Sequence, residues 1–238
     1  LILNEDGSKM SKRDRGAAVH EYQERGFLPE AVVNFLALLG WSPKDDSEVF
    51  LPDELVERFR LENVNRAPAR FDWKKCTWLN QQHLLKLPEE EFAEAAAPAL
   101  AAAGISAPDV TAAMLASVQE KVETLAEIPA ALAFYLTDEL SPDPEVLAKV
   151  RANPDASGLL GGLANAWREL ADWSSAREKI GEVAKEAGKK PGQLMFPLRV
   201  ALSGKAGGPD LGAMIEILGQ DSCVTRVEKF VSLLEQKA

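Results

Sequence analysis

Two lysines near the start of the sequence have the type and spacing that phosphate chemistry needs. Lys9 and Lys12 flank a Met-Ser pair, and Arg13 follows directly. The loop comes just after a turn at residues 4–7, where Gly7 leaves the backbone free to swing. Lysine is a compact, mobile point charge for phosphate, whereas arginine offers a rigid fork. We therefore expect this loop to close over a polyphosphate and to neutralise charge that develops there.

The residues around this loop are similar to those of one enzyme family. The string from Ser8 to Arg13 closely resembles the KMSKS signature of class I aminoacyl-tRNA synthetases. Its context in residues 1–4, 26–31 and 38–43 resembles bacterial-type glutamyl-tRNA synthetases. A short basic run by itself is usually only a solvated loop, so the matching context on both sides favours the functional interpretation.

The resemblance implies a specific role for each residue of the loop. In this family a carboxylate attacks the α-phosphate of ATP, and charge builds on the departing β- and γ-phosphates. Preorganised cations stabilise that transition state more than the ground state. Lys12 is the implied catalytic cation, with Lys9 assisting, and the backbone around Met10 is expected close to the adenine. The implied binding residues for ATP, which arrives with Mg²⁺, are Lys9, Met10, Ser11, Lys12 and Arg13.

The chain is expected to hold only half of such an active site. It begins Leu-Ile-Leu, without an initiator methionine, directly upstream of a motif that the family places in mid-chain. The family's other nucleotide motif, HIGH, is absent from the sequence, as is the amino-acid pocket. We interpret the chain as the C-terminal portion of a longer enzyme whose missing N-terminal domain would bind ATP and glutamate. The fragment alone is predicted to be inactive.

The net charge of −10 is unevenly distributed along the chain. Residues 88–145 carry twelve acidic side chains and a single basic one, so the remainder is close to neutral. Basic side chains gather at 58–75 and again at 185–205. Two separated basic zones could touch the phosphates of one elongated nucleic acid at two places, although each could also be a solvated helix face.

The cysteines and histidines do not form a metal-binding pattern. Cys76 and Cys223 lack C-x-x-C spacing, and His20 and His83 are the remaining soft ligands. This excludes a zinc ribbon and argues against a disulfide framework, so we expect packing roles and a reducing, cytoplasmic compartment. No stretch of the sequence is apolar and long enough to span a bilayer, and no membrane partner is expected.

A second matching segment follows the first basic zone. Residues 65–72, 74–75 and 78–80 resemble the domain that packs on the inner L of tRNA, near the acceptor and D stems. Arginine and lysine there can reach phosphates and 2′-hydroxyls, which is recognition by shape and backbone. Core packing is expected for Trp73 and Trp78. The implied stem contacts are Arg66, Arg70, Lys74 and Lys75.

The third matching segment lies near the C-terminus. Residues 189–204 and 208–211 resemble the end of the family's anticodon-binding domain. Pro197 is predicted to start a helix that projects Arg199 from its first turn. Because a guanidinium can stack on a base and bond its Watson–Crick edge, Arg199 is the expected anticodon reader. Neighbouring glycines would allow close backbone approach and a proline would offer a flat face, which adds Gly208 and Pro209 to the expected anticodon site. The resemblance adds Leu211.

Residues 117–125 resemble a segment in which relatives often carry two arginines. Gln119 and Lys121 stand in their places, so both join the expected anticodon site, but the bidentate geometry of arginine is missing. Strict discrimination between glutamate and glutamine tRNAs is therefore in doubt. An alternative role for Lys121 is pairing with nearby carboxylates.

The elements that position these residues are predicted to be helices. Apolar residues recur at helical spacing from end to end, and the exception is a short strand at 1–3. Prolines and acidic residues indicate helix starts, and one apolar stripe predicts a continuous helix over 114–125. The fold class is all-α. The expected starts are Pro29, Pro52, Asp72-Trp73 and Pro88.

Two composition breaks divide the chain into three predicted parts. Residues 1–87 would hold the lysine loop and the stem-contact domain, and 88–140 and 141–238 would form two helical anticodon-binding subdomains. Two other functions stay open: a stand-alone tRNA-binding module without catalysis, and an acidic helical scaffold for protein partners. An enzyme that also charges glutamine tRNA is a third alternative.

Overall fold

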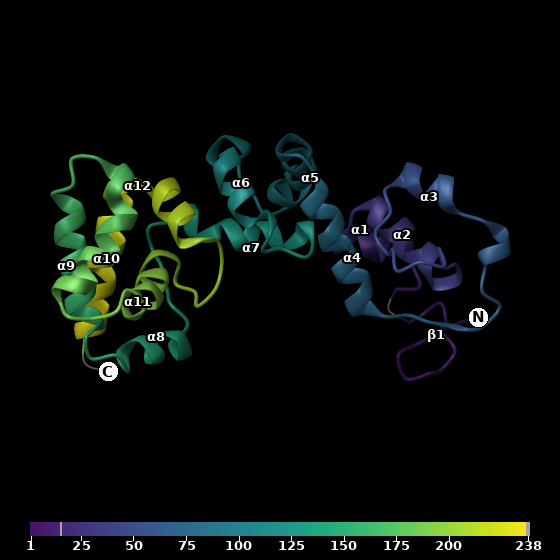
Figure 1. Ribbon diagram of the computed structural model, residues 1–238, viewed down its shortest axis with the longest axis horizontal. Helices are drawn as coiled ribbons and strands as arrows, with labels where there is room; N and C mark the ends of the chain where they lie inside the picture. Colours follow the sequence, from purple (N-terminus) through teal and green to yellow (C-terminus); the bar gives the residue numbers. More distant parts are fainter. Residues whose placement is uncertain (15, 237–238) are drawn as a thin grey trace. The chain divides into compact units, whose positions relative to one another are not determined.

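The described part of the chain is mostly helical, as Figure 1 shows. The computed structural model describes residues 1–14 and 16–236. Strands β1 (Ile2–Leu3) and β2 (Ala69–Arg70) pair in parallel, with Ile2 opposite Ala69. The all-α prediction is confirmed, together with the short strand predicted at the start. None of the helices in the described part of the chain combines the length and apolar character needed to cross a bilayer.

The described chain separates into two compact units, Leu1–Ala130 and Ala131–Ala238. In the first unit α2 packs on α4, and α5 packs on α6. Its helices are α1 (Val19–Glu24), α2 (Pro29–Gly40), α3 (Pro52–Arg58), η1 (Leu61–Asn63), α4 (Trp73–Lys86), α5 (Glu89–Ala102), η2 (Ala107–Asp109), α6 (Ala112–Gln119) and η3 (Leu125–Glu127). Helix α7 (Ile128–Leu132) contains the point of division.

Several helices of the first unit begin where the sequence predicts. Pro29 and Pro52 occupy first turns, where a missing backbone N–H costs nothing. Asp72 caps α4 because its carboxylate accepts a 3.0 Å hydrogen bond from the Lys75 backbone. Acidic residues follow Pro88 at the positive end of α5. These local signals are sufficient to place these four helix starts.

The continuous helix predicted over 114–125 is wrong. Helix α6 ends at Gln119, and a tight turn follows in which the Lys121 backbone donates to the Val118 carbonyl at 2.8 Å. Further on, the Leu125 backbone N–H donates to the Gly26 carbonyl at 2.8 Å. The chain leaves the helix because residues 123–127 lie against the turn at Gly26, where the bond from Leu125 holds them.

This joint between Gly26 and residues 123–127 is tight. Gly26 has φ +75°, and an added Cβ would lie 2.4 Å from the Ala126 nitrogen, so no larger residue fits without movement. Fully buried Asn80 bridges the two sides: its Oδ1 accepts from the Leu28 backbone at 2.8 Å, and its Nδ2 donates to the Glu123 carbonyl at 2.6 Å. The joint therefore fixes the middle of the first unit.

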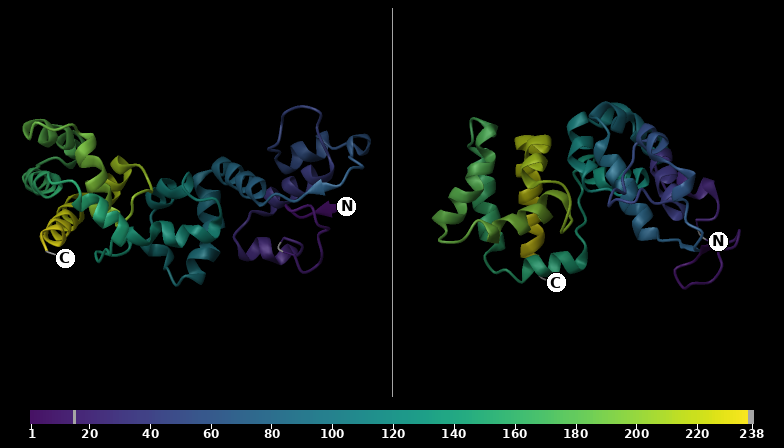
Figure 2. Two further views of the ribbon diagram at one scale, coloured as in Figure 1. Left: turned by 90° about the horizontal axis from the view of Figure 1, so that it is seen from below. Right: turned by 45° about the vertical axis from the view of Figure 1, so that its right-hand side comes forward.

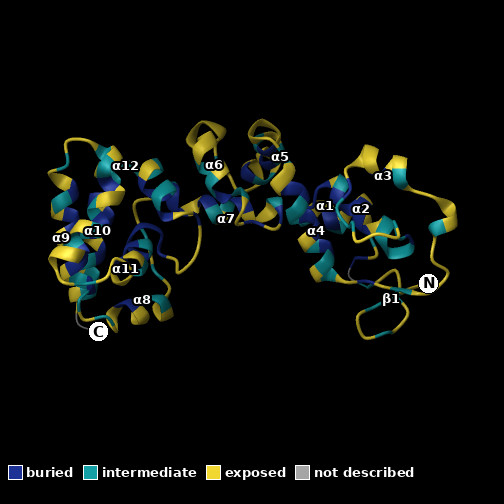
Figure 3. Cartoon of the chain, in the orientation of Figure 1, coloured by how far each residue is buried: buried dark blue, intermediate teal, exposed yellow. Residues whose placement is uncertain are grey.

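The second unit is a helical bundle in which α9 packs on α10, α11 and α12 (Figure 2). Dark blue buried positions lie on the faces that these helices turn toward one another (Figure 3). The helices are η4 (Ala133–Tyr135), α8 (Pro144–Arg151), α9 (Ala156–Arg168), η5 (Trp173–Ser175), α10 (Ala176–Glu186), α11 (Gly192–Ser203) and α12 (Leu211–Glu235), which is kinked at Gly219. Leu160, Leu194 and Leu198 are among its fully buried side chains.

Candidate functional site

The lysine loop begins on the returning arm of a small hairpin and continues beyond it. Leu3 and Lys9 form an antiparallel bridge, and the Met10 backbone donates to the Ile2 carbonyl at 3.0 Å. Gly7 makes the turn with φ +86°, a conformation that L side chains rarely adopt. The hairpin therefore presents residues 8–13 at the edge of the first unit.

The three cations of the loop are open to solvent. Lys9, Lys12 and Arg13 are all exposed. Within the described residues, no hydrogen bond or ion pair occupies their side-chain nitrogens. Unpaired cations on an ordered loop suit an anionic ligand, because no existing contact has to be broken.

Met10 anchors this loop to an aromatic cluster. It packs against the core that contains Tyr22, Phe27 and Phe71. Trp73 adds to the cluster, since its ring centroid lies 5.0 Å from that of Phe71. A hollow over the cluster is lined by both apolar and polar groups, among them Asn4, Met10, Arg13, Asp14, Phe71 and Trp73. The loop thus has an apolar floor and a charged rim.

Strand β2 brings the predicted stem-contact segment beside this hairpin. The Ala69 and Phe71 backbones donate to the Leu1 and Leu3 carbonyls at 3.0 and 2.8 Å. Two of the functions expected from the sequence therefore share one small sheet within the first unit.

The four predicted stem-contact residues differ in their availability. Arg66, Arg70 and Lys74 are exposed, so they can meet a phosphate. Lys75 is half-buried and pairs with Glu48, which offsets its charge. Trp78 is 40% exposed, so the expectation that it packs in the core is wrong.

Arg199 lies in the middle of α11 and is half-buried. The prediction that Pro197 starts this helix is wrong: α11 begins at Gly192, and Pro197 is buried inside it. One Arg199 nitrogen, Nη1, donates to the Pro209 carbonyl at 2.6 Å and lies 3.6 Å from the Met214 sulfur. Arg199 therefore holds the loop after α11 in place.

The other residues predicted for this site surround that loop. An added Cβ on Gly208 would lie 4.0 Å from Arg199 Nη1, so the two positions are neighbours. Pro209 and Leu211 are buried, so the expected open face of Pro209 is turned into the protein. The structure brings together Arg199, Gly208 and Pro209 and places Leu211 at the start of α12.

Gln119 and Lys121 lie in the first unit, on a different part of the fold. The Gln119 amide nitrogen donates to the Leu84 and Leu87 carbonyls at 2.8 and 2.9 Å, which closes the end of α4. Lys121 is exposed and lies 3.9 Å from a Glu120 oxygen, the carboxylate pairing considered as its alternative role.

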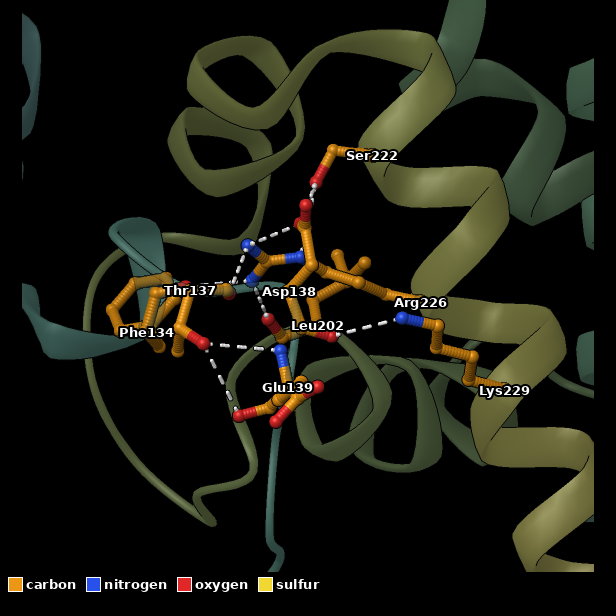
Figure 4. Close-up of polar contacts among 8 residues, drawn as sticks. All are labelled: Phe134, Thr137, Asp138, Glu139, Leu202, Ser222, Arg226 and Lys229. Carbon is orange, nitrogen blue, oxygen red and sulfur yellow. Dashed lines mark hydrogen bonds and ion pairs between the residues drawn. The ribbon is translucent and has the colours of Figure 1, made fainter.

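Arg226 makes several hydrogen bonds inside the second unit, although the sequence did not single it out. It is only 3% exposed, and its guanidinium donates to three backbone carbonyls (Figure 4). Burial lowers the pKa of Arg226, whereas the neighbouring Asp138 raises it. The three acceptors are Phe134 at 2.7 Å, Leu202 at 2.8 Å and Thr137 at 2.8 Å. Arg226 thereby ties α12 to the end of α11 and to residues 134–138.

The buried thiols and the buried imidazole are not equipped for metal binding. Burial raises the pKa of Cys76 and of Cys223 to about 12, so both stay protonated. Burial also lowers the pKa of His83, whose Nε2 lies 3.0 Å from the Asn34 amide oxygen. Across residues 1–14 and 16–236, no group of three or more His, Cys, Asp or Glu side chains could hold a metal ion.

Comparison with known families assigns both ends of the chain. Residues 1–78 match the catalytic domain of class I tRNA synthetases (E and Q), and residues 91–231 match the anticodon binding domain family. The second match covers more than half of the sequence. The chain belongs to the anticodon binding domain family of tRNA synthetases.

The similar relatives within this class are glutamate–tRNA ligases. The chain is 52% identical to the ligase of Akkermansia muciniphila over 97% of its own length and 53% of the relative. It is 40% identical to the Synechococcus ligase over 92% of its length and 47% of that relative. A crystal structure of a glutamate tRNA ligase from Elizabethkingia meningosepticum, in complex with its amino acid, superposes with a TM-score of 0.84 at 29% identity. The superposition covers 99% of this chain and 51% of the Elizabethkingia meningosepticum chain.

The chain spans about half the length of the relatives that it matches. It corresponds to their C-terminal part, which comprises the end of the catalytic domain followed by the anticodon-binding domain. The family resemblance inferred from the sequence is confirmed.

Proposed function

We propose that this chain is the tRNA-binding part of a glutamate–tRNA ligase and that it contributes the lysine loop to ATP chemistry. The carrying observation is that one chain joins a catalytic-domain end at residues 1–78 to an anticodon-binding domain at 91–231. The relatives with this arrangement are glutamate–tRNA ligases. Within this proposal the subdomain limits are 1–87, 88–140 and 141–238, and the RNA is glutamate tRNA.

The proposed chemistry is activation of the glutamate carboxylate by ATP. The carboxylate forms a bond to the α-phosphorus while the bond to pyrophosphate breaks. Lys12 stabilises charge on the departing phosphates, Lys9 assists, and Ser11 and Arg13 border the site. The exposed, unpaired state of these lysines supports the assignment. The exposed side chains of Lys9, Lys12 and Arg13 are cations, so Mg²⁺ would enter bound to the ATP phosphates.

The chain by itself should not activate glutamate. Its sequence contains no HIGH motif, and the lysine loop stabilises a transition state only when the reactants are held beside it. ATP–pyrophosphate exchange by the purified chain should stay at background, while circular dichroism shows a helical spectrum. ATP–pyrophosphate exchange by the chain alone would contradict the proposal that this chain holds only part of the active site.

The proposed tRNA contacts lie in both units. In the first unit Arg66, Arg70 and Lys74 would meet stem phosphates, with Lys75 contributing less because of its pair with Glu48. In the second unit Arg199 would read an anticodon base beside Gly208, Pro209 and Leu211. Gln119 and Lys121, which lie in the first unit, are proposed as further anticodon contacts.

Relaxed specificity is a second candidate, and one observation favours it. The Gln119 amide is already engaged with the end of α4, and Lys121 lacks the fork of arginine. By the resemblance, one of these two positions helps some relatives tell anticodons apart, and neither residue present here offers the geometry of arginine. Glutamine tRNA is therefore a further proposed substrate of the intact enzyme.

The role of Arg199 is tested by pairing it with anticodon changes. Arg199→Ala should cost about 1–3 kcal/mol in binding to glutamate tRNA, which is the usual range for losing a good base contact. The loss should shrink when the anticodon is already substituted, because that contact is no longer made. Lys74→Ala should weaken binding equally for both tRNAs, as phosphate contacts do. The measurement is fluorescence anisotropy at one fixed salt concentration.

A matched variant separates reading from loop support. Arg199 also donates to the Pro209 carbonyl, and Arg199→Lys keeps the charge and one donor but loses the planar edge. If Arg199 reads a base, tRNA binding by both variants should lose its dependence on the anticodon. If Arg199 only supports the loop, Arg199→Lys should restore tRNA binding. An identical loss at Arg199 for every anticodon would show that it is only a backbone contact.

A further inference from the structure

Asp14 is the side chain that ties the distal part of the lysine loop to its hairpin. A single carboxylate oxygen, Oδ2, accepts from the Ser11 backbone N–H at 2.7 Å and from the Asn4 side-chain amide at 3.0 Å. The same Asn4 nitrogen also donates to Ser8 Oγ at 3.0 Å. One acceptor therefore links the start of the hairpin to the middle of the loop.

The rest of the loop has few other restraints. Backbone bonds to the first strand end at Met10. Beyond it, the described contacts of residues 11–13 are local: the Arg13 backbone donates to Ser11 Oγ at 3.3 Å, and the Asp14 backbone donates to the Ser11 carbonyl at 3.1 Å. These local bonds shape the turn, but they do not hold it against the hairpin. Among the described contacts, that connection runs through the Asp14 carboxylate.

We infer that Asp14 is a positioning residue, which acts through Ser11 and Asn4 to fix where Lys12 points. Lys12 lies between Ser11 and Asp14, the two residues that this bond joins, so the bond sets the direction of its backbone. The inference rests on the proposed function, in which Lys12 stabilises charge on the ATP phosphates. Asp14 itself does not touch the reacting atoms.

The environment of Asp14 favours its ionised form. Hydrogen bonds from the Asn4 amide and then from the Ser11 backbone lower the pKa of this carboxyl. An anion beside Lys12 would by itself weaken attraction to phosphates, so two roles have to be distinguished. A positioning role depends on the acceptor oxygen, whereas an electrostatic role depends on the charge.

Two substitutions separate these roles. In Asp14→Asn one amide oxygen can still accept both hydrogen bonds, because a single oxygen accepts both in the native loop, but the charge is gone. In Asp14→Ala both bonds are lost. Both variants are placed in the intact ligase, meaning this chain preceded by the rest of the catalytic domain, and ATP–pyrophosphate exchange is measured.

We expect Asp14→Ala to lower kcat roughly 10- to 100-fold, the range for losing hydrogen bonds to a charged group. The KM for glutamate should be unchanged, and Asp14→Asn should restore most of the rate. Asn4→Ala should reproduce the defect in part and should add little to Asp14→Ala, since the two residues share one bond. Thermal unfolding should be the same for all variants, because the loop lies at the surface.

A second readout tests the connection without any catalysis. In this chain the amide hydrogen of Ser11 should exchange several-fold faster in Asp14→Ala, as expected for a lost protecting bond, and near the native rate in Asp14→Asn. Unchanged exchange in Asp14→Ala would overturn the inference.

The activity results are judged against Lys12→Ala. If Lys12→Ala is impaired and Asp14→Ala is not, the proposed function stands and the positioning role fails. If Asp14→Asn is as slow as Asp14→Ala, the charge matters rather than the position, and the inference is again overturned. If Lys12→Ala leaves the reaction unchanged, the proposed function fails, and hydrogen exchange then decides whether Asp14 holds the loop.

Discussion

Replacing Lys12 with alanine should lower glutamate activation by the intact ligase about 10²- to 10³-fold, while its affinity for tRNA stays nearly intact. The magnitude is that of removing one preorganised charge-stabilising group from an active site. Lys12 is exposed and unpaired within the described residues, so its removal disturbs no contact of the fold. Because the proposed interaction is made in the transition state, kcat and kcat/KM should fall together.

The measurement is ATP–pyrophosphate exchange beside tRNA binding by anisotropy. Lys86→Ala is the matched control, since it removes one exposed lysine from the end of α4 and should leave the exchange rate unchanged. A Lys12 variant with normal exchange but weakened tRNA binding would show that the loop contacts RNA instead.

Arg226→Met should destabilise the second unit by about 3–5 kcal/mol. The substitution keeps an apolar stem of similar length but removes every donor to the carbonyls of Phe134, Thr137 and Leu202. Each buried carbonyl left without a donor costs about 1–3 kcal/mol, and breaking a buried charged pair costs about 3–5 kcal/mol. The loss should appear as a lower urea midpoint followed by circular dichroism.

A neighbouring residue provides the control for Arg226. Lys229 lies one turn further along α12, and it donates one 3.3 Å bond to the Asp138 carbonyl at an exposed position. Lys229→Met removes the same charge, yet should cost less than about 1 kcal/mol. Equal midpoints for the two variants would contradict the role of Arg226 as the tie between α11, α12 and residues 134–138.

Several helix starts of the first unit could be predicted from the sequence because each depends on local chemistry. Pro29, Pro52 and Asp72 act within one turn of their own position, so no knowledge of distant residues was needed. The end of α6 could not be predicted in this way. It depends on the bond between Leu125 and Gly26, residues far apart in sequence that only the folded chain brings together.

The candidate site likewise contains features that the sequence predicts and features that depend on distant contacts. The Lys9 to Arg13 loop was identified by residue types and spacing, and the structure leaves these cations exposed. The burial of Pro209 and the hydrogen bonds of Arg226 could not be predicted, because both depend on the packing of α11 against α12. Asp14 carried a local signal, since it lies three residues after Ser11 and can accept from that backbone, but its second partner, Asn4, is visible only once the hairpin has formed.

The most direct test of the central claim is equilibrium binding of the wild-type chain to glutamate tRNA. The claim predicts measurable binding that weakens steeply as salt rises, because lysine and arginine displace counterions from phosphates. At fixed salt, binding should also weaken by about 1–3 kcal/mol when an anticodon base is replaced. The same affinity for the native and the substituted anticodon, or no binding at low salt, would contradict the account.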